Sequence, residues 1–207
     1  MSNMQNTNCL YEEINITEPN KINNQKLKYN IKCVILGDAA TGKTSIINTY
    51  HTTHKKNYES TLGATYWELN FKYDNKNIKV NFWDTAGQER YNSLIPMYIR
   101  DCDIVILTFD LTNRDSFKNL EKWRKFVFKN YDLPNIIIVG NKADLELYIK
   151  IEQAEIEEYL EKNFCKKPKF FRTSALENIN ISNLFDYVFD VSKYIIETKK
   201  IEPKVIF

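Results

Sequence analysis

Residues 37–44 read Gly-Asp-Ala-Ala-Thr-Gly-Lys-Thr, and this stretch decides which fold the chain is expected to adopt. It follows a mostly apolar run, Ile31–Leu36, which suits a buried strand, and a helix should begin within Gly42–Ser45. A glycine-rich turn between a strand and a helix points backbone N–H groups at phosphate oxygens, and the helix dipole favours the bound anion. The alternative is an ordinary glycine turn. The expected phosphate-binding residues are Ala39, Ala40, Thr41, Gly42, Lys43, Thr44 and Ser45.

Two side chains at the end of this stretch suit a nucleoside triphosphate. Lys43 supplies a positive charge to the β- and γ-phosphates, and the Thr44 hydroxyl can ligate Mg²⁺. Thr61 is a second candidate metal ligand, in a polar segment that we expect to form a loop between the first helix and a hairpin. It would engage only when a γ-phosphate is present. The alternative is a loop threonine that is merely solvated.

The octapeptide Trp83–Arg90 (Trp-Asp-Thr-Ala-Gly-Gln-Glu-Arg) places an acid, a glycine and a glutamine directly after an alternating, strand-like run. Asp84 can reach a phosphate-bound metal ion, and Gly87 lets its backbone N–H approach a terminal phosphate closely. Gln88 can orient an attacking water molecule. The octapeptide therefore predicts a switch that senses the γ-phosphate, with Gln88 as its catalytic residue.

A base-recognition motif, Asn141-Lys142-Ala143-Asp144, follows another apolar run, 135–139. The Asp144 carboxylate can accept from both N1–H and the 2-amino group of guanine, whereas adenine would leave it unpaired. Asn141 can bind the base edge, and the stem of Lys142 can lie along the ring. The usual alternative for such a tetrapeptide is a helix cap after a strand. The segment 173–176 would support guanine through backbone N–H groups, and its expected site residues are Ser174, Ala175 and Leu176.

Alternating strand-like and helix-like segments predict an α/β fold with a largely parallel sheet and helices on both faces. Residues 66–73 and 78–83 flank the turn-like cluster 74–77 and should form a hairpin that contributes an antiparallel strand. Further strands are expected at 104–109, at 135–139 and from Phe170. Helices are expected over 116–129 and 152–161, with a closing amphipathic helix that carries residues 184–195. Ligands of such sheets bind beyond the carboxyl ends of the strands, where these motifs fall.

Length and composition predict one domain, placed at residues 28–198, between a flexible N-terminal extension over 1–27 and a short tail over 199–207. A net charge of +2 does not indicate a nucleic-acid partner. The four cysteines are far apart, which favours free thiols over a zinc site, with Cys33 packed inside a strand. No apolar run approaches a membrane span and no signal pattern is visible, so a cytoplasmic protein is expected.

Together, these motifs resemble the Ras superfamily of small GTPases and, within it, the Rab family. The segments Phe109–Asn113 and Trp83–Tyr91 look Rab-like, and Glu59–Ala64 and Ser93–Tyr98 look most like the early-endosomal branch. The resemblance implies a three-layer P-loop NTPase fold with a six-stranded, mostly parallel sheet containing one antiparallel strand. It also implies bound GTP or GDP with Mg²⁺.

The resemblance further implies partners: effectors that read the switches, an exchange factor and a GTPase-activating protein, with the chain itself a monomer. The expected effector-binding residues are Leu62, Tyr66, Trp83 and Tyr98, for which core packing is the alternative. His54 stands where the family usually places an aromatic residue against the purine, so faster nucleotide release is expected. An exposed loop histidine is the alternative there.

The ends of the sequence depart from the family pattern. It ends Lys204-Val205-Ile206-Phe207 without a prenylation cysteine, and it begins Met1-Ser2 without a myristoylation glycine. We therefore expect either that the native end differs or that partners bring the chain to membranes. Peripheral association with the cytosolic face of endosomal or other vesicle membranes is expected from the family resemblance alone.

The function expected from the sequence is a GTP-hydrolysing switch in vesicle trafficking. One alternative is a guanine-nucleotide-dependent binding module with little hydrolysis and no direct membrane anchor, and Gln88 argues against it. A second is a P-loop kinase or ATPase acting on small metabolites, against which the base motif at Asp144 argues. A structural scaffold would not need the phosphate loop.

Overall fold

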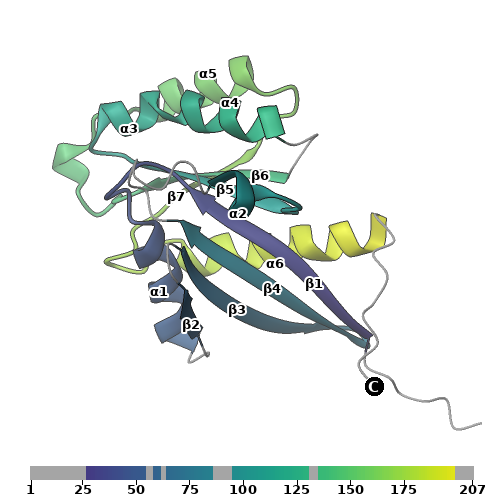
Figure 1. Cartoon of the computed structure of the whole chain (residues 1–207). Coiled ribbons are helices and arrows are strands. Elements are labelled where there is room, and N and C mark those ends of the chain that lie inside the picture. The colour runs from purple at the N-terminus through teal and green to yellow at the C-terminus, as the bar shows by residue number, and fades with distance from the viewer. Residues whose placement is uncertain (1–26, 55–57, 62–63, 86–94, 131–134, 199–207) are drawn as a thin grey trace, which may run out of the picture.

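A sheet of seven strands forms the middle layer of the computed structural model, which describes residues 27–54, 58–61, 64–85, 95–130 and 135–198 (Figure 1). Across the sheet the order is β2-β3-β4-β1-β5-β6-β7. Strand β3 pairs antiparallel with β2 and β4, and every other neighbouring pair is parallel. The strands are β1 (Leu27–Leu36), β2 (Tyr58–Thr61), β3 (Ala64–Tyr73), β4 (Lys76–Thr85), β5 (Ile104–Asp110), β6 (Asn135–Asn141) and β7 (Lys169–Arg172).

The predicted fold class is confirmed, because one strand runs against an otherwise parallel sheet. The short edge strand β2 is the difference from the six strands expected. It includes Thr61, for which the sequence predicted a loop, and its register pairs Tyr58 with Trp67 and Thr61 with Ala64. An edge strand bonds its neighbour through the backbone alone and needs no apolar side chains. The polar sequence of this segment therefore did not reveal it.

Helices cover both faces of the sheet (Figure 1). Helices α1 (Lys43–His54) and α6 (Ile181–Thr198) pack on one face, and α2 (Ile95–Ile99), α3 (Arg114–Lys118), α4 (Leu120–Asn130) and α5 (Gln153–Asn163) pack on the other. A short 3₁₀ helix, η2 (Glu146–Tyr148), follows β6. None of the helices in the described part of the chain is long and apolar enough to cross a membrane.

The single helix expected over 116–129 is two helices that meet at Asn119. Helix α3 begins after Asn113, whose side chain accepts from the backbone N–H groups of Asp115 and Ser116. Asn119 keeps helical dihedral angles (φ −71°, ψ −10°), and its N–H bonds back to the Asp115 carbonyl. The break is therefore slight, and side chains before and after it still share one face.

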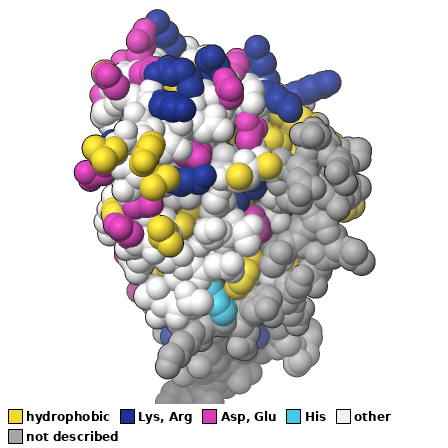
Figure 2. Space-filling view, turned by 90° about the vertical axis from the view of Figure 1, so that its left-hand side faces the viewer, with side chains coloured by type: hydrophobic (Ala, Val, Ile, Leu, Met, Phe, Trp, Pro, Cys, Tyr) yellow, Lys and Arg dark blue, Asp and Glu magenta, His cyan; other side chains and the backbone are white. Residues whose placement is uncertain are grey.

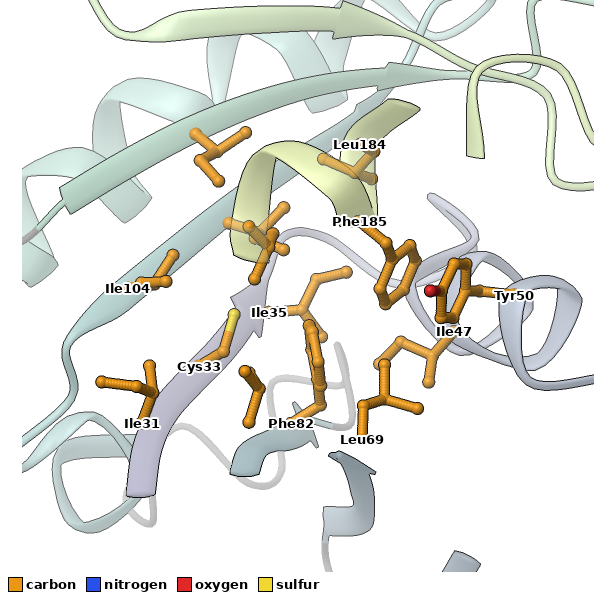
Figure 3. Close-up of a cluster of buried hydrophobic side chains, with 14 of the residues drawn as sticks. Ile31, Cys33, Ile35, Ile47, Tyr50, Leu69, Phe82, Ile104, Leu184 and Phe185 are labelled. Atoms are coloured by element: carbon orange, nitrogen blue, oxygen red, sulfur yellow. The ribbon is translucent and has the colours of Figure 1, made fainter. Parts of the chain in front are cut away.

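Strand β1 is buried on both faces, as its apolar run predicted. Cys33 and Ile35 face the cluster under α1 and α6, and Val34 and Leu36 face the cluster under α2 to α5. In the first cluster Tyr50 of α1 stacks on Phe185 of α6 with ring centroids 3.9 Å apart (Figure 3). This packing on both sides fixes the end of β1, from which the phosphate loop emerges.

The carboxyl ends of the parallel strands β4, β1, β5 and β6 meet at one edge of the sheet. The segments that follow them, among them residues 37–42, 111–113 and 142–145, therefore lie together. Figure 2 faces the left-hand side of Figure 1, toward which β1 points, and shows basic and acidic side chains interspersed there. This edge is where every predicted motif in the described residues falls.

Candidate nucleotide-binding site

The phosphate loop between β1 and α1 has a backbone that only small residues allow. Gly37 adopts φ +150°, and a Cβ atom there would lie 2.1 Å from the Thr108 carbonyl oxygen of β5. Gly42 adopts φ +91°, and its Cβ would lie 2.2 Å from Asn141 Nδ2. Ala40 also has a positive φ, of 61°. The loop thus presses its backbone against β5 and the base motif, a close approach that glycine permits.

Lys43, the first residue of α1, folds its side chain back into this loop. Its Nζ donates to the carbonyl oxygens of Gly37 at 2.9 Å and Asp38 at 2.7 Å, and the residue is only 5% exposed. Burial lowers its pKa, and the nearby carboxylates of Asp84 and Asp38 oppose that shift. Among the described residues these two carbonyls account for two ammonium hydrogens. An ammonium group has three hydrogens, so the third could be donated to a phosphate oxygen.

Thr44 and Asp84 meet from α1 and the end of β4. The Thr44 hydroxyl donates to Asp84 Oδ2 at 2.5 Å. The other oxygen, Oδ1, is buried with no hydrogen-bond partner in the described part of the chain. Burial raises the pKa of Asp84, against the opposing effects of the Thr44 hydrogen bond and the Lys43 charge. A hydroxyl beside a buried, half-satisfied carboxylate is a donor set that suits a hard divalent cation.

Asn141 joins the phosphate loop to the loop after β7. Its Nδ2 donates to the Thr41 carbonyl at 3.0 Å, and its Oδ1 accepts from the Ala175 N–H at 3.1 Å and the Thr173 hydroxyl at 3.2 Å. The residue is 2% exposed. These bonds use both acceptor positions of Oδ1 and one of the two Nδ2 hydrogens, and they hold the two loops together.

Asp144 lies at the surface of the same region with a carboxylate oriented by Ser174. The Ser174 hydroxyl donates to Asp144 Oδ1 at 2.5 Å and accepts from the Glu177 N–H at 3.0 Å. Lys142, in the left-handed region at φ +67°, forms a 2.6 Å ion pair with Asp110. Burial tends to raise the Asp110 pKa, but hydrogen bonds from Lys142 and Thr112 outweigh it and lower that pKa. Contacts with Ser174 and Asp110 thus fix the side chains of the base motif at the carboxyl ends of the strands.

The remaining predicted site residues differ in how far they are buried. Thr41 is buried, and its hydroxyl donates to the Asp38 carbonyl at 3.0 Å. Exposed residues at the rim are Ala39, Ala40, Thr44, Ser45 and Leu176. Predicted residues that fall outside the described residues or their described side chains are His54, Thr61, Leu62, Gly87 and Gln88.

Three aromatic residues predicted to bind effectors form one contiguous cluster. The Trp83 ring lies 5.4 Å from that of Tyr66 and 5.8 Å from that of Tyr98, between centroids, and Lys32 Nζ lies 5.3 Å from its ring. Tyr66 donates its hydroxyl to Asn81 at 2.7 Å. Trp83 and Tyr66 are half-buried, whereas Tyr98 is buried. The structure therefore brings together side chains from β3, β4 and α2.

Sequence reasoning missed two acidic residues of the site. Asp110 ends β5 at the same edge as the other motifs, and its ion pair positions Lys142. Its place directly after an apolar run was a signal that could have identified it. Asp38 lies inside the phosphate loop and binds side chains of the α3–α4 junction. No local pattern indicated that contact, because its partners lie more than 80 residues away.

Comparisons with known proteins agree with this geometry. The phosphate loop, the Thr44–Asp84 pair and the base motif on a mostly parallel sheet define a P-loop nucleotide-binding protein. The Ras family model matches residues 32–193. The Ras-related protein Rab-5A of Dictyostelium discoideum is 38% identical over 167 residues, which cover 79% of this chain and 81% of the relative. Rab-11B of the same organism is 34% identical, covering 80% and 75%, and RHN1 of Nicotiana plumbaginifolia is 38% identical, covering 75% and 78%.

The chain belongs to the Ras family and is a small GTPase of the Rab type. It is therefore an enzyme that binds guanine nucleotides and hydrolyses GTP, in a family that serves vesicle transport. The expected fold, family and enzyme class are confirmed. The similarity extends to relatives with different Rab names, so it does not single out one transport step.

Proposed function

We propose that this GTPase is a Mg²⁺-dependent switch that recruits effector proteins in the endocytic branch of vesicle transport. The observation that carries the proposal is the Thr44–Asp84 contact beside the buried Lys43, at the edge where the base motif also lies. A γ-phosphate reader needs a cation, a metal-ligand pair and a base pocket at fixed relative positions. Lys43 and Thr44 begin α1, Asp84 lies at the end of β4, and the base motif follows β6, so all three parts meet at one edge of the sheet.

Thr44 and Asp84 would hold the Mg²⁺ ion, with Thr61 added in the GTP state. When bound, Mg²⁺ neutralises charge on the β- and γ-phosphate oxygens. The chain itself supplies the ammonium group of Lys43, the backbone N–H groups of the phosphate loop and the dipole of α1. The unpartnered Asp84 Oδ1 supports this assignment, since a buried carboxylate oxygen is costly to leave unsatisfied.

Asp84→Asn is expected to separate the contribution of the metal from that of folding. Without Mg²⁺ the variant should melt a few degrees above wild type, because it buries no half-satisfied charge. With Mg²⁺ and GDP, wild type should gain thermal stability and the variant should gain little, because it has lost the charged ligand. Melting curves with EDTA and with Mg²⁺ measure both effects. Equal stabilisation of the two proteins by Mg²⁺ would refute the assigned ligand.

Gln88 is proposed to position the water that attacks the γ-phosphate in line. Intrinsic turnover should be slow, with a GTP-state lifetime of roughly half an hour, and a GTPase-activating partner that inserts an arginine could add about 10⁵-fold. The alternative is a binding module that barely hydrolyses, and it predicts a different response to mutation.

Gln88→Leu is expected to slow single-turnover phosphate release at least several-fold, because leucine cannot orient water. GDP affinity should stay close to that of wild type, since the side chain is assigned to the reaction and not to nucleotide binding. Phosphate release from preloaded GTP, followed by a fluorescent phosphate sensor, gives the rate. Identical rates in both proteins would sink the catalytic assignment and favour the binding module.

Effector recognition is proposed for the aromatic cluster of Tyr66, Trp83 and Tyr98, and for Leu62. The half-buried Tyr66 and Trp83 rings are held in contact, and Trp83 also packs on the buried Tyr98, so little conformational freedom is lost on binding, which is what an interface anchor requires. The exchange factor and the GTPase-activating protein would act at the same sheet edge. His54, at the end of α1, is proposed to pack on the purine less tightly than an aromatic residue would.

The endocytic branch is proposed from the early-endosomal character of Glu59–Ala64 and Ser93–Tyr98. The relative named Rab-5A, at 38% identity, compared with 34% for Rab-11B, supports this choice. Association with the cytosolic face of these membranes would be peripheral. Colocalisation of the tagged full chain with internalised dextran in living cells tests the proposal, and confinement to other compartments contradicts it.

A further inference from the structure

We infer that Asp38 is a positioning residue, which Trp123 and Asn119 hold so that the phosphate loop and Lys43 keep their nucleotide-binding arrangement. The inference rests on the proposed role of Lys43 at the terminal phosphates. It extends the site to the α3–α4 junction, which carries none of the predicted nucleotide-binding residues. Asp38, Asn119 and Trp123 together form a positioning network.

Both carboxylate oxygens of Asp38 accept hydrogen bonds from that junction. Trp123 Nε1 donates to Oδ1 at 2.8 Å, and Asn119 Nδ2 donates to Oδ2 at 2.7 Å. Trp123 is 5% exposed and packs in the core cluster under α2 to α5. Hydrogen bonds to a carboxylate are stronger than neutral ones. The side chain of Asp38 is thus anchored to an element packed against β5.

The backbone carbonyl of Asp38 accepts a hydrogen bond from the phosphate-binding residue Lys43. Asp38 O accepts from Lys43 Nζ at 2.7 Å and from the Thr41 hydroxyl at 3.0 Å. A rotation of this peptide unit would therefore move the acceptor away from both groups. Gly37, on the other side, has its position fixed against the Thr108 carbonyl. The side chain of Asp38 consequently attaches the phosphate loop to the α3–α4 junction.

The two donors are preorganised by helix geometry. Asn119 and Trp123 are four residues apart, and the Trp123 N–H donates to the Asn119 carbonyl at 3.1 Å. Residues at this spacing lie on the same helical face, so both side chains can reach one carboxylate. Core packing fixes the indole ring, and the capped helix α3 leads directly into Asn119. Little side-chain freedom remains to be lost when the bonds form.

The test measures release of a fluorescent GDP analogue from the full chain in the presence of Mg²⁺. Asp38→Ala and Trp123→Phe should each release the nucleotide at least about three-fold faster than wild type, because each deletes a hydrogen bond to a charged group. The double variant should release no faster than the faster single variant, since both changes break the same bond. Trp67→Phe is the matched control, because that buried tryptophan lies in the opposite core cluster and should leave the rate unchanged.

Asp38→Asn separates positioning from a direct effect of charge on Lys43. The asparagine oxygen can accept from Trp123, and the Asn119 amide can turn to present its oxygen, so release should stay close to wild type. If Asp38→Asn released nucleotide as fast as Asp38→Ala, charge and not positioning would be responsible. Unchanged release in Asp38→Ala or in Trp123→Phe, with folding verified by circular dichroism, would also overturn the network. A wild-type chain that fails to retain the analogue would instead refute the underlying nucleotide site.

Discussion

Replacing Asp144 with asparagine is expected to lower the affinity for GTP at least about 100-fold and to raise the affinity for xanthosine triphosphate. In the proposed site the carboxylate would accept hydrogen bonds from two donors of guanine, whereas an asparagine amide would face one of those donors with a donor of its own. Xanthine carries an oxygen in place of the 2-amino group, and that oxygen needs a donor. Ser174 already orients Asp144 at 2.5 Å, so the substituted amide should occupy nearly the same place.

Competition against a fluorescent guanine nucleotide measures this switch in base preference. The matched control is Asp110→Asn, because that carboxylate lies at the same sheet edge but binds Lys142 at 2.6 Å. This control variant should bind both GTP and xanthosine triphosphate more weakly and leave the ratio of the two affinities unchanged. If Asp144→Asn retained guanine selectivity, the assigned base contact would be wrong.

Replacing Gly37 with alanine is expected to destabilise the fold by about 3 to 5 kcal/mol and to lower the melting temperature by about 10 °C. The new Cβ would lie 2.1 Å from the Thr108 carbonyl oxygen, a backbone atom in the central strand β5. Strands β1 and β5 cannot move apart to relieve this clash, because both lie between the two core clusters. The backbone angle of φ +150° adds strain for any residue other than glycine.

Gly140→Ala provides the control for this clash. The nearest atoms to a Cβ there are Phe109 Cζ at 2.9 Å and Leu111 Cδ2 at 3.0 Å, both at the ends of side chains. Side chains can give way where a strand backbone cannot, so we expect a loss of only about 1 to 2 kcal/mol. Thermal unfolding of the nucleotide-free chains compares the two. A Gly37→Ala chain as stable as Gly140→Ala would show that the phosphate loop tolerates displacement from β5.

Much of the fold was predictable because its signals are local. The apolar runs ending at Leu36 and Val139 identified central strands, and the cluster around Asp74 identified the hairpin turn. Strand β2 was missed, because its sequence Tyr-Glu-Ser-Thr shows no apolar alternation, and the break at Asn119 was missed, because both halves share one face. In each case the deciding contact is between backbone groups, which side-chain patterns do not report.

The site was predicted as a set of motifs, but not as a set of bonds. The sequence indicated that Thr44 and Asp84 serve one metal, and the structure places them in contact. For Asn141 the expectation was a base contact. The structure shows that the amide also bonds Thr41, Thr173 and Ala175, which uses one of its two Nδ2 hydrogens, and the base contact stays a prediction. A short motif shows which functional groups are present, but it does not show which distant residues form hydrogen bonds with them.

The sequence by itself determined the class of site, because phosphate, metal and guanine each require particular residue types at short, fixed spacings. Gly37 to Thr44, Asp84 and Asn141 to Asp144 carry that information within a few residues each. Only the tertiary structure decided how the parts support one another. The bonds from Trp123 and Asn119 to Asp38 span more than 80 residues, and they exist because α4 and β1 pack against the same strand, β5.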